Sequence, residues 1–199
     1  MSKELFKRIV KADENSETIL KIVLIKKYLE KNPDGTARIW AMYARSLIGM
    51  GRYEDASSAL ERAEKMAFEN QIQWIVSQRG TLELRRGNIE AAKSYWMSAH
   101  QINPKEASYL IFAASAECQL GHLQQAEALA RRATKCTDGC VDEAWYNLGG
   151  YLAAQEQYEE ALECYRKATS IDPEYEIALK RRDEILAAFP DLAQNDDLT

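Results

Sequence analysis

The sequence has few residues that interrupt helices and no apolar run long enough to cross a membrane. Its 199 residues include only 4 prolines and 9 glycines, so long stretches contain no strong helix breaker. The apolar run at 22–25 has four residues, whereas a membrane-spanning helix needs about 20. Charges are scattered through residues 1–17, a pattern that excludes a secretory signal peptide. These observations favour a helical protein of the cytoplasm.

Residues suited to nucleophilic or metal chemistry are also scarce. The two histidines, His100 and His122, have no carboxylate or cysteine at the spacing of a catalytic triad. Cys136 and Cys140 do not form a CxxC pair, and no second pair follows at a zinc-site spacing. Whether these two cysteines have a redox role is left open. We therefore predict no catalytic residue, no metal site, no cofactor and no enzymatic activity.

The net charge of −5 is distributed unevenly along the chain. Residues 1–106 carry 18 Lys+Arg and 14 Asp+Glu, a net charge of +4, whereas residues 107–199 carry 8 and 17, a net charge of −9. Solvated helix faces account for both halves, but this polarity would also allow one copy to contact another as a homo-oligomer. The acidic second half argues against a nucleic-acid partner, and we expect no membrane partner.

A repeat of 34 residues is the strongest pattern in the chain. Within 142–175, Trp145, Leu148 and Leu152 recur at helical spacing, and Pro173 ends a second helix after a short break. Two such short helices cannot bury their apolar faces alone, so each pair needs neighbours of its own kind. Similar residues occur at the same positions of the repeat in 37–70, 73–106 and 107–140. We call each such set of equivalent positions a column.

Small residues occupy the columns where two helices would have to approach closely. These are Ala44, Gly80, Ala114 and Gly149. Glycines at 51, 87 and 121 would permit the tight turn inside a repeat. Together, these columns resemble the tetratricopeptide repeat family. The resemblance implies an all-α, right-handed α-solenoid of antiparallel helix pairs, with about four repeats between helical caps.

The predicted division of the chain follows the repeat columns. Residues 1–36 would form an N-terminal helical cap or degenerate repeat, and 37–70, 73–106, 107–140 and 142–175 the four repeats. Residues 174–189 would form a C-terminal capping helix, and 190–199 an acidic, disordered tail.

In the family, one face of each repeat's first helix lines a concave groove that holds peptides. Carried over to this chain, the groove residues are Arg38, Arg45, Ile48, Trp74, Ser77, Thr81, Arg85, Ile111, Ser115 and Tyr146. Trp40, Trp96 and Trp145 fall in structural columns, so Trp74 is the tryptophan expected to contact a ligand. Arginines beside apolar side chains would suit an acidic-hydrophobic peptide or an amphipathic helix.

A non-enzymatic scaffold for protein–protein interaction is therefore the predicted function. Heat-shock chaperone adaptors of this family hold a C-terminal carboxylate with a clamp of basic and amide side chains. The corresponding columns here carry Ala41, Arg45 and Gln78 among others, so we expect no such clamp. Two alternatives stay open: a secretion-type chaperone, which residues 112–128 loosely resemble, and a self-assembling structural or adaptor subunit.

Overall fold

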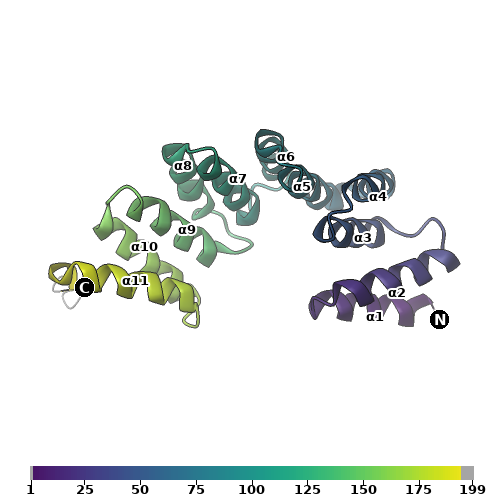
Figure 1. Cartoon of the computed structure of the whole chain (residues 1–199), viewed down its shortest axis with the longest axis horizontal. Coiled ribbons are helices and arrows are strands. Elements are labelled where there is room, and N and C mark those ends of the chain that lie inside the picture. Colours follow the sequence, from purple (N-terminus) through teal and green to yellow (C-terminus); the bar gives the residue numbers. More distant parts are fainter. Residues whose placement is uncertain (1, 194–199) are drawn as a thin grey trace. The chain divides into compact units, whose positions relative to one another are not determined.

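The computed structural model describes residues 2–193, which form eleven α-helices and one short 3₁₀ turn (Figure 1). No strand occurs among these residues, so the predicted all-α, α-solenoid class of fold is confirmed. The chain divides into two compact units, Met1–Ile102 and Asn103–Thr199, and each is described by itself below.

Unit Met1–Ile102 consists of three helical pairs. Its helices are α1 (Ser2–Glu14), α2 (Thr18–Lys31), α3 (Ala37–Gly49), α4 (Tyr53–Met66), α5 (Glu69–Arg85) and α6 (Ile89–Ile102). The partners of each pair are consecutive in sequence and pack side by side. Leu47 of α3 and Leu60 of α4 are fully buried in one core, and Ile9 of α1 and Ile25 of α2 in a second. The apolar spacing read from the sequence therefore marks the buried side of each helix.

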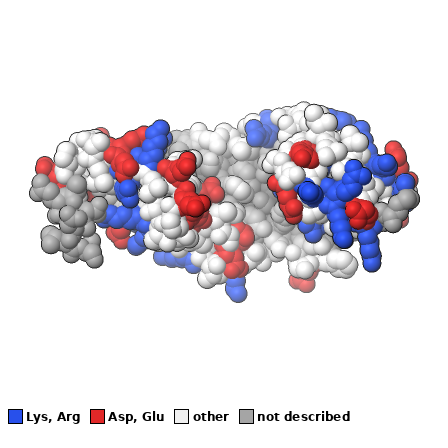
Figure 2. Space-filling model, turned by 90° about the horizontal axis from the view of Figure 1, so that it is seen from below, with Lys and Arg blue, Asp and Glu red and all other residues white. Residues whose placement is uncertain are grey.

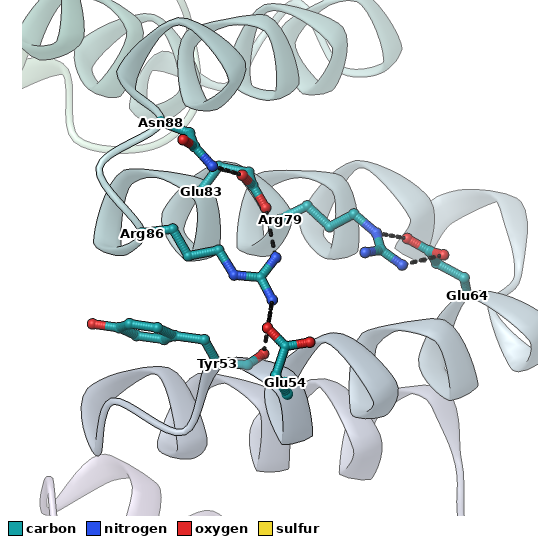
Figure 3. A network of polar contacts seen from close by, with 7 residues as sticks. All are labelled: Tyr53, Glu54, Glu64, Arg79, Glu83, Arg86 and Asn88. Carbon is teal, nitrogen blue, oxygen red and sulfur yellow. Dashed lines mark hydrogen bonds and ion pairs between the residues drawn. The ribbon is translucent and has the colours of Figure 1, made fainter.

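A salt-bridge network joins α4 to α5 (Figure 3). Arg86 donates to Glu54 at 2.7 Å and to Glu83 at 3.0 Å, while Asn88 donates to the other oxygen of Glu83 at 2.7 Å. The hydrogen bond from Asn88 is the main reason that the pKa of Glu83 lies below its ordinary value; burial opposes this effect, and the hydrogen bond from Arg86 adds to it. These contacts, together with the ion pair of Arg79 on α5 with Glu64 on α4, add directional restraints to the packing of the two helices.

Unit Asn103–Thr199 has two helical pairs followed by a single helix. Its helices are α7 (Ala107–Gln119), α8 (Leu123–Ala133), α9 (Val141–Ala153), α10 (Tyr158–Ile171) and α11 (Glu176–Ala188), and the 3₁₀ turn is Pro190–Ala193. Leu148, Leu152 and Tyr165 are buried at the centre of its core, and Leu192 of the turn packs against that core. Of the disordered tail predicted at 190–199, residues 190–193 form this turn, and residues 194–199 lie outside the described residues.

Two glycines in the small-residue columns sit directly beneath aromatic rings. A Cβ atom at Gly80 would lie 2.6 Å from Nε1 of Trp96, and one at Gly149 would lie 2.7 Å from Cε1 of Tyr165. Both distances are too short for carbon to occupy without moving a buried ring. The Trp96 indole is further fixed because it donates to the Ser77 carbonyl at 3.1 Å. At these two positions the residue is glycine because an aromatic ring of the partner helix occupies the space that a side chain would need.

The turn inside each repeat uses a left-handed backbone conformation at one column. Gly51, Gly87 and Gly121 have φ angles of 72°, 86° and 81°, as their predicted role in tight turns requires. Glu156 occupies the same column after α9 with a φ of 61°. A side chain is strained there, so the repeat at 142–175 makes the same turn at an energetic cost.

Helices α5 and α9 begin before the predicted starts of their repeats, α9 by one residue, at Val141. Helix α5 begins at Glu69, before the predicted repeat start at 73, because the two inserted residues at 71–72 continue its first turn.

Trp40 and Trp96 are buried, as their columns predict, whereas Trp145 is only half-buried. The Lys167 ammonium lies 4.5 Å from the centre of the Trp145 ring. The assignment of individual repeats stays a prediction.

Candidate peptide-binding surface

Three hollows in unit Met1–Ile102 share Arg38 in their walls, and we call them together the Arg38 hollow. Their volumes are about 340, 490 and 420 Å³. Arg38 is exposed in the first turn of α3, directly after the Thr36 N-cap, whose hydroxyl accepts from the Ile39 amide at 3.3 Å. The cap fixes the start of α3, and this start sets where the guanidinium stands.

Aromatic side chains from three segments surround Arg38. Its guanidinium carbon lies 5.6 Å from the ring centre of Phe6, a residue of α1. Trp74 of α5 lines the first hollow and packs with its inner side against both cores of the unit. Phe68, the residue before α5, lines the second hollow and is 74% exposed. The hollow thus presents a cation together with uncovered apolar rings, which are the side chains that dominate protein-binding sites.

The polar groups of the hollow are mixed in sign. Helices α3 and α5 both begin at its wall, and the free amides of a first helical turn carry partial positive charge. Asn70 and Gln71 add amide side chains, whereas Asp34 and Glu14 bring carboxylates to two of the three hollows. Among the described residues, no carboxylate lines the first hollow, which Arg38 and Trp74 line, so this is the part suited to an acidic group.

Arg45, two turns further along α3, already forms an ion pair within the protein. Its guanidinium hydrogen-bonds the Asp13 carboxylate of α1, and Lys21 of α2 donates to the same carboxylate at 2.7 Å. Burial tends to raise the pKa of Asp13, but these hydrogen bonds outweigh it and leave that pKa lowered. Arg45 therefore joins the first three helices, and a ligand would have to displace Asp13 to reach it.

The other predicted groove residues divide by burial. Ile48, Ser77 and Ile111 are buried, because their side chains fill the space against neighbouring helices, so they offer no surface to a ligand. The Thr81 hydroxyl is half-buried and donates to the Ser77 carbonyl at 3.3 Å. Arg85 and Ser115 belong to none of the three hollows.

Tyr146, in the other unit, lies in an aromatic cluster. Its ring centre is 5.3 Å from that of Tyr175 and 5.9 Å from that of Tyr165. Burial raises the pKa of both neighbouring tyrosines to about 12. The nearby Glu143 carboxyl also has a raised pKa, through burial and then through the charge of Asp142. Arg181, whose pKa is raised by hydrogen bonds to Glu184 and then to Tyr146, also lies at this cluster, so its charges are of both signs.

The sequence did not single out Phe6, Phe68 or Gln71. Phe6 lies in the predicted N-terminal cap and Phe68 at the end of the first repeat, so neither occupies a groove column. The sequence could have indicated Phe6 and Phe68 by the argument used for Trp74, because each is an aromatic residue outside the structural columns. Only the packing of α1 and α5 beside α3 brings them to one place.

Groups of three or more potential metal ligands are absent from residues 2–193, and so is any helix long and apolar enough to cross a membrane. The His122 ring contacts the Glu117 carboxylate at 2.8 Å. Cys140 is exposed, and the Cys136 thiol, just after α8, contacts the Pro104 carbonyl at 3.6 Å. Burial raises the pKa of both thiols, which lowers the fraction present as reactive thiolate.

Two of the helical pairs match a known repeat family. The family model for the tetratricopeptide repeat matches residues 37–70 and, separately, residues 142–175. These two segments of the chain are tetratricopeptide repeats. Human tetratricopeptide repeat protein 7A is 27% identical over 135 residues, which are 68% of this chain but 15% of that protein. The chain thus spans a small part of the curated relatives it matches.

Solved structures of tetratricopeptide repeat proteins share the fold. TTC0263 from Thermus thermophilus has a TM-score of 0.70 at 19% identity, covering 94% of this chain and 100% of its own. YrrB, described as having an unusual peptide-binding site, has a TM-score of 0.57 at 21% identity, covering 90% of each chain. Tetratricopeptide repeats form scaffolds for protein–protein interaction and are generally non-enzymatic.

Proposed function

We propose that this protein is a non-enzymatic scaffold that binds an acidic-hydrophobic segment of a partner protein in the Arg38 hollow. The observation that carries the proposal is the placement of an exposed guanidinium among Phe6, Trp74 and Phe68. Arg38 would pair with a carboxylate of the segment, and the rings would cover its apolar side chains. The cytoplasm, predicted from the sequence, is the compartment that this proposal assumes.

The predicted groove narrows in this proposal to residues that lie beside one another at the hollow. Arg38 and Trp74 are retained, and Phe6, Phe68 and Gln71 are added. Arg45 is set aside because Asp13 holds it. Ser115 and Tyr146 lie in the other unit and are not needed for binding at the hollow.

Selection of random 12-residue peptides displayed on phage tests the proposal without knowledge of the natural partner. We expect the selected peptides to combine Asp or Glu with aromatic or large aliphatic residues. Because an arginine–carboxylate pair in a partly desolvated site contributes about 2 kcal/mol or more, Arg38→Glu should weaken binding of the selected peptides at least ~30-fold. Trp74→Ala should weaken it about tenfold or more. Isothermal titration calorimetry measures both.

Arg85→Glu is the matched control, since it makes the same charge change at an arginine outside the hollow. It should alter the dissociation constant less than about threefold, because screening weakens a distant charge. Circular dichroism shows whether each variant keeps its helices. Equal affinity of wild-type protein and Arg38→Glu for the selected peptides would exclude the Arg38 hollow as the site.

A further inference from the structure

Helix α2 has apolar residues on two sides, and one of these sides is exposed. Ile22, Ile25 and Tyr28 are buried within unit Met1–Ile102. On the outer side, Ile19 is 75%, Leu20 43% and Val23 56% exposed. Lys26 and Lys27, both exposed, follow at the spacing of the next helical turn. We call Ile19, Leu20, Val23, Lys26 and Lys27 the α2 face. Figure 2 shows Lys and Arg side chains, with some Asp and Glu among them, over the end of unit Met1–Ile102 that α1 and α2 form.

The other unit has an exposed surface of the opposite charge where α10 ends and α11 begins. Ile171 is 51% and Ile177 55% exposed, and between them Glu174 and Glu176 are exposed as well. We call these four residues the α10–α11 corner. Among residues 2–193, no ion pair includes either lysine of the α2 face or either glutamate of the corner. Both surfaces thus combine uncovered aliphatic side chains with charges that form no ion pair within the described part of the chain.

The two surfaces complement each other in sign and in chemistry. Residues 1–102 carry 17 Lys+Arg and 13 Asp+Glu, a net charge of +4, whereas residues 103–199 carry 9 and 18, a net charge of −9. Burying aliphatic side chains against one another favours association, and opposite charges beside them fix the orientation and exclude like surfaces. An α2 face set against a second α2 face would instead bring lysines together. We propose that the α2 face of one copy binds the α10–α11 corner of a second copy.

Such a contact is heterologous, since each copy offers two different surfaces. One copy can therefore bind a neighbour through each, and association continues beyond a dimer unless a ring closes. The few side chains involved imply a weak interface, with a dissociation constant on the order of 10–100 µM. Its charged part should be screened by salt. None of these residues belongs to the Arg38 hollow, so self-association and peptide binding can be measured separately.

Sedimentation velocity on the full chain at several concentrations, in low and in high salt, tests the proposal. We expect assembly that increases with concentration and weakens at least about tenfold in roughly 0.5 M salt. Lys26→Glu/Lys27→Glu and, separately, Glu174→Lys/Glu176→Lys should each abolish it, because each variant places like charges opposite one another. Mixing these two variants should restore assembly, since lysines then face glutamates at both contacts, in the native arrangement at one and in the swapped arrangement at the other. A chain with all four changes should assemble again.

Lys65→Glu/Lys135→Glu is the matched control, because it alters net charge by the same amount at exposed lysines outside both surfaces. It should assemble like the wild type. A wild-type chain that is monomeric throughout would overturn the proposal, as would a dimer lost in the lysine variant but kept in the glutamate variant, which would show that α2 pairs with itself. Absence of a complex in the mixture of the two variants would overturn it too.

Discussion

The two units use their aromatic residues differently. In unit Asn103–Thr199, Tyr146 packs against Tyr165 and Tyr175, with ring centres 5.9 and 5.3 Å away. In unit Met1–Ile102, Phe6 and Trp74 lie beside Arg38 at the wall of a hollow. Residues 142–175 match the repeat family through their regular columns, yet those columns mainly serve internal packing. Recognition is proposed for the unit whose aromatic residues depart from the columns.

The first prediction asks whether the two units share the same close helix contact. Gly80→Ala and Gly149→Ala should each lower the free energy of unfolding by about 1–2 kcal/mol, because a Cβ would displace Trp96 or Tyr165. This is a net value, since alanine itself favours a helix by roughly 0.5–1 kcal/mol. Urea denaturation followed by circular dichroism measures the change.

Gly150→Ala and Gly49→Ala are the controls for those substitutions. A Cβ at Gly150 would come no nearer than 4.0 Å to the Tyr165 hydroxyl, and one at Gly49 would meet nothing within 4 Å. Both should be neutral or stabilising by up to about 0.5–1 kcal/mol. If alanine at 80 or 149 were equally harmless, the role assigned to the small-residue column would be wrong.

The second prediction concerns pH, to which one carboxyl in each unit should respond with opposite sign. The folded pKa of Asp13 is lowered below 3.8, so its stabilising contribution exists above that pH and is lost as the pH falls through the folded pKa. The folded pKa of Glu143 is raised above 4.5, so its contribution exists below pH 4.5 and is lost as the pH rises through the folded pKa.

Asp13→Asn should therefore destabilise the protein at about pH 7, and this difference from wild type should shrink towards about pH 3. Glu143→Gln should stabilise it at neutral pH, with a difference that shrinks below pH 4.5. Urea denaturation of the three proteins at neutral, intermediate and acidic pH tests both statements. A destabilised Glu143→Gln at neutral pH would contradict the raised pKa assigned to this half-buried carboxyl.

The third prediction, with the smallest effect, compares the two units at the turn inside each repeat, where Glu156 stands in place of glycine. Glu156→Gly should stabilise unit Asn103–Thr199 by several tenths of a kcal/mol to about 1 kcal/mol, since glycine adopts the φ of 61° without strain. Gly121→Glu, in the same column and the same unit, should have the opposite effect. Thermal unfolding measures the change, and hydrogen exchange locates it. Destabilisation by Glu156→Gly would show that this side chain makes a contact worth more than its strain.

The fold could be predicted because short-range features of the sequence determine each helical pair. These features are the apolar spacing, the small residues beneath rings and the glycine at the turn. The binding surface could be predicted only in part. Arg38 and Trp74 follow from the columns, but the burial of Ile48 and Ile111 depends on how neighbouring helices pack. The pairing of Arg45 with Asp13 joins residues 32 positions apart on different helices, and no periodic pattern contains that information. Phe6 and Phe68 lie outside the columns for the same reason.

The four tryptophan indole N–H signals provide the most direct test of the central claim. Trp74 belongs to the Arg38 hollow, whereas Trp145 lies in the other unit. Titration of ¹⁵N-labelled protein with the tightest phage-selected peptide, with signals assigned by Trp→Phe substitution, compares the two units in one sample. The account predicts that the Trp74 signal shifts most while the Trp145 signal stays in place. A shift of Trp145 with Trp74 unmoved would contradict it.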